Sequence, residues 1–298
     1  MRQAHYIFLR LRGVEGLGHG DAKLLGATGA WLGWTALAPV IFVAAILGLA
    51  WAGLAALGDS GAAHAGAWAK EPGEAQAITS LTFDGADRAL DADGEAAFDA
   101  DFAKIEVSSF VEWGLTPRLT LVLQPVVQTV EQRDGSGGVD RETGFASSQI
   151  GARWLLASPP GGAISAQGAL VAPGEAENVT DAPLGDGGVA AEARLLAGRG
   201  WGGDARGAFA EGQLGYRWRS DGDPGEARFD ATLGVRASPE WMVIGQSFSI
   251  WSDGEPVASV REFRSHKAQL SVVRRINDRW SIQAGGFGTY AGRNVVEE

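Results

Sequence analysis

From Ala75 onward, apolar and polar residues alternate along the chain with a period of two. Between Ala103 and Trp113 every second position is mostly apolar, and the positions between them carry Lys104, Glu106 and Glu112. Such alternation is typical of β-strands that have one apolar and one polar face. Strands are predicted over 75–83, 101–114, 117–131, 143–157, 162–173, 187–197, 206–219, 226–237, 240–252, 259–274 and 279–291.

The lengths of these segments and of their connections indicate a membrane barrel. The segments run to about 9–15 residues, longer than the ~5–6 of an ordinary strand and suited to a tilted crossing of a bilayer. The connections alternate between short turns and longer polar loops, as in outer-membrane barrels. The short turns are 115–117, 158–161, 238–239 and 277–278, and the loops are 84–100, 132–142, 174–186, 220–225 and 253–258. The glycine-rich segment 198–205 fits neither class.

Three tryptophans stand beside short turns: Trp113, Trp241 and Trp280. In a membrane barrel they would form an aromatic girdle at one interface with water. A soluble β-sandwich with these rings in its core is the alternative. The opposite faces of the strands are polar and of mixed charge, which predicts a lumen filled by side chains or a narrow channel. The residues expected to face inward are Arg153, Gln167, Glu211, Gln213, Arg217, Arg228, Asp230 and Arg236.

A different pattern precedes the strands. Leu24–Gly58 has no charged residue and is divided by Pro39. Val40–Leu57 is long enough for one transmembrane helix, and Leu24–Trp34 is expected to be a membrane-embedded or interfacial helix. Basic residues precede this stretch and mostly acidic residues follow it, so the N-terminus is predicted to stay cytoplasmic and the remainder to be exported. Two parts are therefore expected, a membrane segment at 1–65 and a barrel at 66–298.

Two short motifs follow the apolar stretch. Ala63-His64-Ala65 and Ala67-Trp68-Ala69 both have the small-x-small pattern that signal peptidase cleaves. The apolar stretch is longer than that of most cleaved signals. Cleavage and retention as an uncleaved anchor therefore both remain open.

The segment before the apolar stretch contains Gly18-His19-Gly20-Asp21-Ala22-Lys23-Leu24-Leu25, followed by Gly29-Ala30-Trp31-Leu32-Gly33-Trp34. Over about residues 7–57 the chain resembles type IV prepilin peptidases, the GxGD aspartic proteases of the inner membrane. The resemblance implies that Asp21 corresponds to one of two catalytic aspartates, and that Gly18 and Gly20 let the backbone approach a substrate.

Aspartic protease chemistry needs a second carboxylate, which the family carries on an earlier transmembrane helix. No such helix precedes Asp21 in this chain, and the downstream aspartates begin at Asp59, beyond the predicted span. The expected role of 1–65 is therefore a peptidase remnant acting as an export signal or anchor. An aspartic prepilin endopeptidase acting through Asp21, with a prepilin as substrate, is the alternative.

The amino-acid composition limits the classes of partner and cofactor that this chain can be expected to bind. The formal net charge is −11 and there is no cysteine. The acidic balance argues against nucleic acid, and the lack of cysteine excludes disulfides, thiol catalysis and cysteine-bound zinc. The acidic run 84–100 matches no calcium-loop spacing, so a solvated loop is expected. No cofactor or metal is expected.

The second part also resembles proteobacterial outer-membrane barrels of the porin or transporter kind, through Phe110–Pro125 and Gly285–Asn294. The resemblance implies an all-β barrel of about 11–12 antiparallel strands in the outer membrane of the cell envelope. We expect a small-solute pore or a structural envelope protein whose partner is the lipid bilayer; an adhesion protein that uses the long loops is the rival.

Eleven strands is an odd number, whereas bacterial single-chain barrels have even numbers. The strand pattern therefore predicts either a closing strand beyond Glu298 or a miscount around 198–205. It also leaves open that the two parts come from two reading frames joined in error.

Overall fold

The computed structural model describes residues 66–133, 138–174, 184, 188–203, 206–220, 224–253 and 262–297. All of them belong to one compact unit, Ala50–Glu298. The predicted membrane segment 1–65, with Asp21 and its flanking glycines, lies outside the described residues. Within the described ranges no helix is long and apolar enough to span a bilayer.

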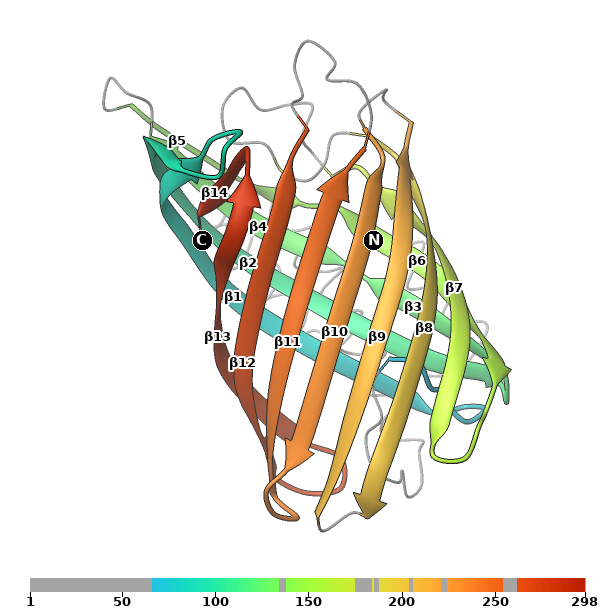
Figure 1. Ribbon diagram of the computed structural model, residues 1–298. Coiled ribbons are helices and arrows are strands. Elements are labelled where there is room, and N and C mark those ends of the chain that lie inside the picture. The colour runs from blue at the N-terminus through green and yellow to red at the C-terminus, as the bar shows by residue number, and fades with distance from the viewer. Residues whose placement is uncertain are drawn as a thin grey trace, which may run out of the picture. The chain divides into compact units, whose positions relative to one another are not determined.

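The described chain is all-β, with every strand antiparallel to its neighbours (Figure 1). Each of the eleven predicted segments coincides with observed strand structure, because the alternating pattern already separates the two faces of each strand. The strands are β1 (Ala75–Leu90), β2 (Ala96–Thr116), β3 (Leu119–Gln124), β4 (Val126–Arg133), β5 (Val139–Phe145), β6 (Ser148–Ala157), β7 (Gly162–Ala172), β8 (Ala190–Gly203), β9 (Arg206–Arg219), β10 (Glu226–Arg236), β11 (Trp241–Ser252), β12 (Arg264–Arg275), β13 (Ser281–Arg293) and β14 (Val295–Glu297).

Two of the predicted strands are each broken once. Pro125 separates β3 from β4 because proline has no N–H to donate to a neighbouring strand. The break is matched across the sheet, where Ala146 and Ser147 separate β5 from β6. The hydroxyl of Ser148 accepts a hydrogen bond from the Val126 N–H (2.9 Å) and donates one to the Ala146 carbonyl (3.0 Å). The Ser148 side chain thus replaces part of the backbone hydrogen bonding that is interrupted between the strands.

The prediction of a loop at 84–100 is wrong. β1 continues to Leu90 and β2 begins at Ala96, so only a short turn lies between them. The acidic residues of this segment belong to an extended hairpin rather than a solvated loop, and opposite charges pair across its strands. Asp84 pairs with Lys104 in the strand register, and their charged groups lie 3.1 Å apart.

The glycine-rich segment 198–203 is also strand, so the miscount considered for 198–205 does not occur. β8 is continuous from Ala190 to Gly203 and pairs with β9 along its whole length. The eleven long strands therefore stand as counted, with β3–β4 and β5–β6 each taken as one broken strand.

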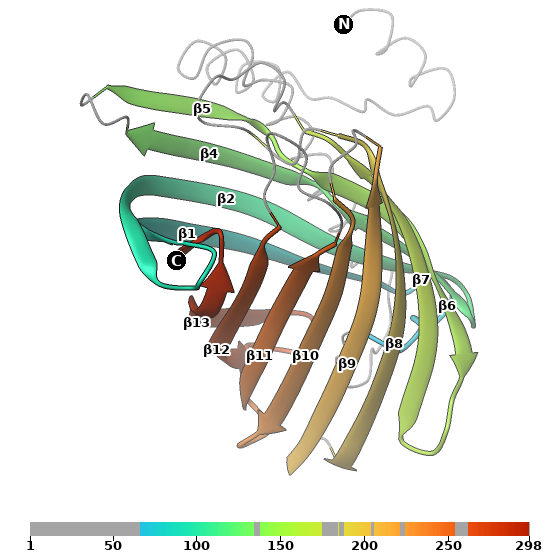
Figure 2. The ribbon, with the colours of Figure 1, turned by 45° about the horizontal axis from the view of Figure 1, so that its top comes forward.

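The two ends of the sheet meet only at one rim. β1 and β13 both run away from the short turns, so they cannot pair with each other in antiparallel fashion. After Asn294, whose φ is 52°, the chain turns back and β14 pairs with β1 at three positions, Arg88 with Glu297, Ala89 with Val296 and Leu90 with Val295 (Figure 2). β14 thus lies where a twelfth strand would begin, and the sheet is not closed along its length. The expectation of a further closing strand stays a prediction.

The turn between β1 and β2 is organised by Asp91. Its carboxylate accepts hydrogen bonds from the backbone N–H groups of Asp93 (2.9 Å) and Glu95 (3.0 Å), and its own carbonyl accepts one from the Asn294 N–H (3.0 Å). The hydrogen bond from the Glu95 backbone is the main cause that holds the pKa of Asp91 below its usual value.

We expect the stabilisation of this turn by Asp91 to be present at neutral pH and to fade as the pH falls past the ordinary pKa of an aspartate and through the lowered pKa of Asp91. The reason is that a depressed pKa means the folded state favours the ionised carboxylate. Amide hydrogen exchange at Asp93 and Glu95, measured between pH 6 and pH 2.5 after correction for intrinsic rates, checks this. In Asp91→Asn the protection should lose its pH dependence; an unchanged profile would contradict the assignment.

Candidate functional site

The outer face of the sheet carries large apolar side chains that are open to the surroundings. Leu214 is 61% exposed and Leu270 is 64% exposed, each near the middle of its strand. A water-soluble protein rarely exposes so large a contiguous apolar surface. Other members of this outer band are Leu81, Phe83, Ile105, Ile150, Leu170, Leu195, Phe229, Leu233, Val243, Val272 and Ile282.

The tryptophans beside the short turns lie at one end of this band. Trp113, Trp241 and Trp280 are about half exposed, which is incompatible with the alternative of a sandwich core. The structure adds Trp154 and Trp201, which the pattern of short turns did not single out although each lies close to the end of its strand. All five stand at the short-turn end.

A second group of aromatic rings lies at the opposite end. Trp251 packs edge-on against His266 with ring centroids 5.2 Å apart, and His266 lies 6.0 Å from Tyr290. Tyr216 and Trp218 form another pair at 4.9 Å. Trp241 and Trp251 are ten residues apart on β11, so at ~3.3 Å per residue and a tilt of ~40° the two groups are about 25 Å apart along the membrane normal. That separation matches the apolar band of a transmembrane barrel.

The inner face carries charged side chains that are buried. In a water-soluble protein the buried side chains are mostly apolar and the charged ones are exposed. Arg153 on β6 is 2% exposed and donates hydrogen bonds to Glu112 on β2 and to Gln167 on β7 (3.1 Å). Lys70 reaches the same Glu112, with its ammonium 3.7 Å from the carboxylate. The side chains of three strands and of the segment before β1 therefore form one network.

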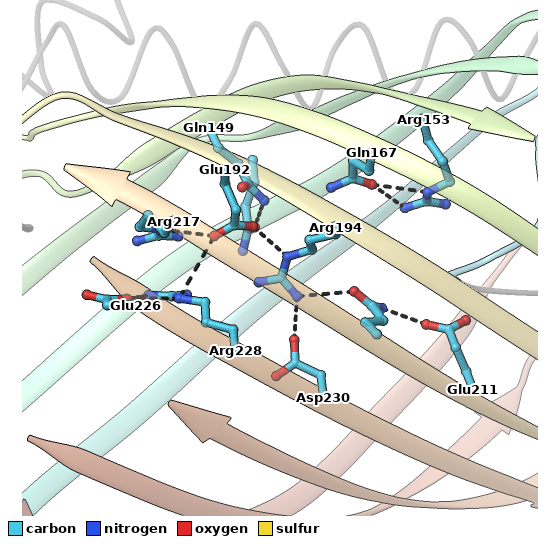
Figure 3. A network of polar contacts seen from close by, with 12 residues as sticks. Gln149, Arg153, Gln167, Glu192, Arg194, Glu211, Arg217, Glu226, Arg228 and Asp230 are labelled. Atoms are coloured by element: carbon cyan, nitrogen blue, oxygen red, sulfur yellow. Dashed lines mark hydrogen bonds and ion pairs between the residues drawn. The ribbon is translucent and has the colours of Figure 1, made fainter. Parts of the chain in front are cut away.

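A second part of the network spans β8, β9 and β10 (Figure 3). Glu192 accepts hydrogen bonds from Arg194 (2.5 Å) and Arg217 (2.9 Å). Arg194 also pairs with Asp230 (2.5 Å). At the long-loop end, Glu226 is held between Arg219 and Arg228, each at 2.5 Å.

The expected inward-facing residues share this inner face. The strand register places Gln167 beside Arg153 and Arg194, and Arg236 on the same side of β10 as Arg228 and Asp230. Sequence reasoning missed several partners of these residues. Alternation within the predicted strands would have found them, since each lies at an inward position. They are Glu192, Arg194, Arg219 and Glu226.

The chain before β1, Gly66–Lys70, lies across the inner face without regular secondary structure, and we call it the strap. The Arg153 guanidinium donates to the Gly66 carbonyl, and the Ser165 hydroxyl donates to the Ala67 carbonyl (2.5 Å). The Glu211 carboxylate accepts from the Ala67 N–H (2.8 Å), and the Lys70 N–H donates to Thr120 (3.0 Å). These contacts reach strands from β3 to β9, so the strap lies across much of the inner wall.

Small residues make room for the strap. Ala67 packs against Ala163 and Leu196 in a small buried cluster, with Trp68 beside them. A Cβ placed on Gly198 would lie 2.5 Å from the Trp68 ring. The glycine-rich end of β8 therefore provides the surface on which the Trp68 ring rests.

We expect Gly198→Val to displace the strap and to lower the free energy of unfolding by about 1–3 kcal/mol, because the added side chain overlaps Trp68. Urea unfolding in detergent micelles measures the stability. Maleimide labelling of Ala67→Cys, in a chain that has no other cysteine, reports the exposure of the strap.

Gly168→Val on the neighbouring β7 is the matched control, because a Cβ there meets nothing within 4 Å. It should leave both the stability and the labelling unchanged. Equal labelling in the two valine variants would show that Gly198 does not seat the strap.

The short turns, the outer band and the charged inner face together resemble a known architecture. An outer membrane channel from Pseudomonas putida F1 superimposes with a TM-score of 0.58, covering 81% of this chain and 94% of that chain at 16% identity. The sheet has the fold of an outer membrane channel. The similarity at this level of identity concerns the fold alone.

The N-terminal segment has a separate relationship. Residues 4–53 match the type IV leader peptidase family. Prepilin leader peptidase/N-methyltransferases of Burkholderia pseudomallei strains 1026b and K96243 are 58% identical over 45 residues, 15% of this chain and 15% of each relative. The Dickeya chrysanthemi enzyme is 53% identical over 45 residues, 15% of this chain and 16% of that relative. The chain thus spans about 15% of the length of the curated relatives it matches, and both expected resemblances are confirmed.

The candidate peptidase residues Asp21, Gly18 and Gly20 fall within the match but outside the described residues, so their role stays a prediction. In the part of the chain that the structure describes, no three His, Asp or Glu side chains are grouped to hold a metal ion.

Proposed function

We propose that the chain forms a transmembrane β-barrel in the outer membrane and conducts small polar solutes. The reversal of polarity between the two faces is the observation that carries this proposal. A band of exposed apolar side chains about 25 Å tall suits the hydrocarbon of a bilayer, and the two groups of aromatic rings suit its interfaces. Pairing of the open edges of β1 and β13 with further strand structure is part of the proposal, because unpaired backbone groups in lipid cost several kcal/mol each.

The inner network would line the path of the solute. Arg153 on β6, Arg194 on β8 and Arg228 on β10 each pair with a carboxylate of the inner face, so these charged groups are fixed rather than mobile. Because both signs alternate along the wall, we expect weak selectivity between cations and anions. The strap narrows the short-turn end of the path.

Conductance in planar bilayers tests the proposal. Addition of the purified full chain should produce discrete current steps, whereas a structural envelope protein or an adhesion protein would produce none. Gln269, on the inner side of β12, offers an internal control. Gln269→Glu and Gln269→Arg should shift the reversal potential in a salt gradient in opposite directions. If the channel conducts but neither change moves the potential, the solute path does not follow this face.

A second candidate function follows from the N-terminal match. The family similarity favours an aspartic prepilin peptidase acting through Asp21, with a prepilin as substrate. The matched segment covers only a small share of the known enzymes, so we propose that 1–65 acts instead as an export segment. Cleavage of a prepilin by the full chain that disappears in Asp21→Asn would support the peptidase and overturn the export role as the sole function of this segment.

A further inference from the structure

Glu211 is the exception among the buried carboxylates of the inner face. Glu112, Glu192 and Glu226 each form ion pairs with arginines. Glu211 is 8% exposed, and among the described residues its hydrogen-bond donors are the Ala67 N–H (2.8 Å) and the Gln213 amide (2.6 Å), both uncharged. A carboxylate buried to this degree normally has a cation in direct contact.

The nearby Arg153 does not fill this role. Its guanidinium is occupied by Glu112, by Gln167 and by the carbonyl of Gly66. No ion pair of Glu211 is formed within the described ranges. The carboxylate is therefore oriented toward the beginning of the strap without an ion-pair partner among the described residues.

Gly66 lies directly against this carboxylate. A Cβ on Gly66 would fall 1.5 Å from the Glu211 Oε2, and its φ of +90° is one that other residues rarely adopt. Only glycine fits here, and its nitrogen is one bond from the Cα that faces the carboxylate. A positive charge on that nitrogen would supply the missing cation.

The sequence provides a way to create that charge. The peptide bond Ala65–Gly66 follows the small-x-small motif Ala63-His64-Ala65, whose residues lie outside the described ranges. Hydrolysis there breaks the C–N bond and adds water. The hydroxyl goes to the Ala65 carbonyl carbon, and the Gly66 nitrogen takes one hydrogen from water and the proton that the new carboxyl group releases. The products are a carboxylate on Ala65 and an α-ammonium on Gly66, which is largely protonated near pH 7.

We propose that Glu211 and the strap form a binding site for the α-ammonium of Gly66, which is generated when a signal peptidase of the cell envelope cleaves after Ala65. The other motif, Ala67-Trp68-Ala69, is the wrong site by this argument. Cleavage after Ala69 would remove Ala67, whose N–H and carbonyl are bound by Glu211 and Ser165. Cleavage after Ala65 would thus also create the charge that binds the strap to Glu211. The inference rests on the export of residues 66–298 that the proposed function assumes.

The first test is the start of the mature protein. The full chain is expressed in a bacterium and recovered from the outer-membrane fraction, and its intact mass and N-terminal sequence are determined. We expect the chain to begin at Gly66. A chain that begins at Met1 or at Lys70 would overturn the proposal.

The second test is the reactivity of the α-amine toward an N-hydroxysuccinimide ester at pH 7, located by peptide mass mapping. In the folded wild type we expect labelling at Gly66 to be at least about tenfold slower than in urea, because an ion-paired amine stays protonated. Equal rates in the two states would overturn the site, and this comparison needs no variant.

Glu211→Gln keeps the shape of the side chain and removes its charge, so it separates pairing from burial. Labelling at Gly66 should rise severalfold in this variant, and should not change in Glu142→Gln, which alters an exposed carboxylate on β5. If the labelling rate at Gly66 is the same in Glu211→Gln as in the wild type, burial alone protects the amine, and the proposed ion pair is contradicted. The labelling result can be distinguished from the conductance result. If the chain begins at a protected Gly66 but carries no current, the proposed conductance is wrong and the proposed ammonium site stands.

Discussion

Arg153→Met is expected to lower the free energy of unfolding by about 3–5 kcal/mol, because it leaves Glu112 buried beside a partner that can no longer donate. Among the described residues Glu112 would keep only Lys70, whose ammonium lies 3.7 Å away, and the Gly66 carbonyl would lose its donor Arg153. Methionine preserves much of the volume of the side chain, so the loss reports the charge and its hydrogen bonds. Urea unfolding in detergent micelles, followed by tryptophan fluorescence, measures the change.

Two comparisons make this result specific. Arg118→Met, at an exposed position in the turn between β2 and β3, should change the stability by less than about 0.5 kcal/mol. The double variant Arg153→Met with Glu112→Met removes both charges and should recover much of the loss, since apolar pairs often replace buried ion pairs without penalty. If the double variant is as unstable as the sum of the two single variants, the pair is not the reason for the effect.

Leu270→Arg is expected to cost about 2–4 kcal/mol in a bilayer, the range for an arginine near the midplane on the lipid side of a barrel. Leu270 lies in the middle of β12, is 64% exposed and has no charged neighbour on its face of the strand between His266 and Arg274. Urea unfolding of the protein folded into phosphatidylcholine vesicles measures the cost.

Gln269→Arg places the same side chain on the adjacent residue, which faces inward. Its effect on stability should be within about 1 kcal/mol, because the inner face is polar and water can reach it. A large penalty at Leu270 beside a small one at Gln269 is expected for a membrane barrel. The reverse order would indicate that the face carrying Leu270 contacts water, and the membrane proposal would fail.

Much of this architecture is encoded locally. The positions of the long strands, the apolar side of β9 and β10, and the tryptophans beside the turns all follow from alternation with a period of two. That period is a property of the extended backbone itself, so it can be recognised without knowing which strands are neighbours. The limits of the strands are less well encoded. The hairpin of β1 and β2 extends past the expected loop because pairs such as Asp84 with Lys104 stabilise it only once the strands are aligned.

The candidate site depends on distant parts of the chain. Sequence reasoning placed Arg153 and Glu211 on the inner face, but it did not place either of them beside the strap. The contact between Ala67 and Glu211 joins residues 144 positions apart, and the ion pair between Arg153 and Glu112 depends on the order and register of β2, β3 and β6. Alternation assigns each side chain to a face. Only the tertiary structure decides its neighbours there, because curvature and register bring distant strands together across the inner wall.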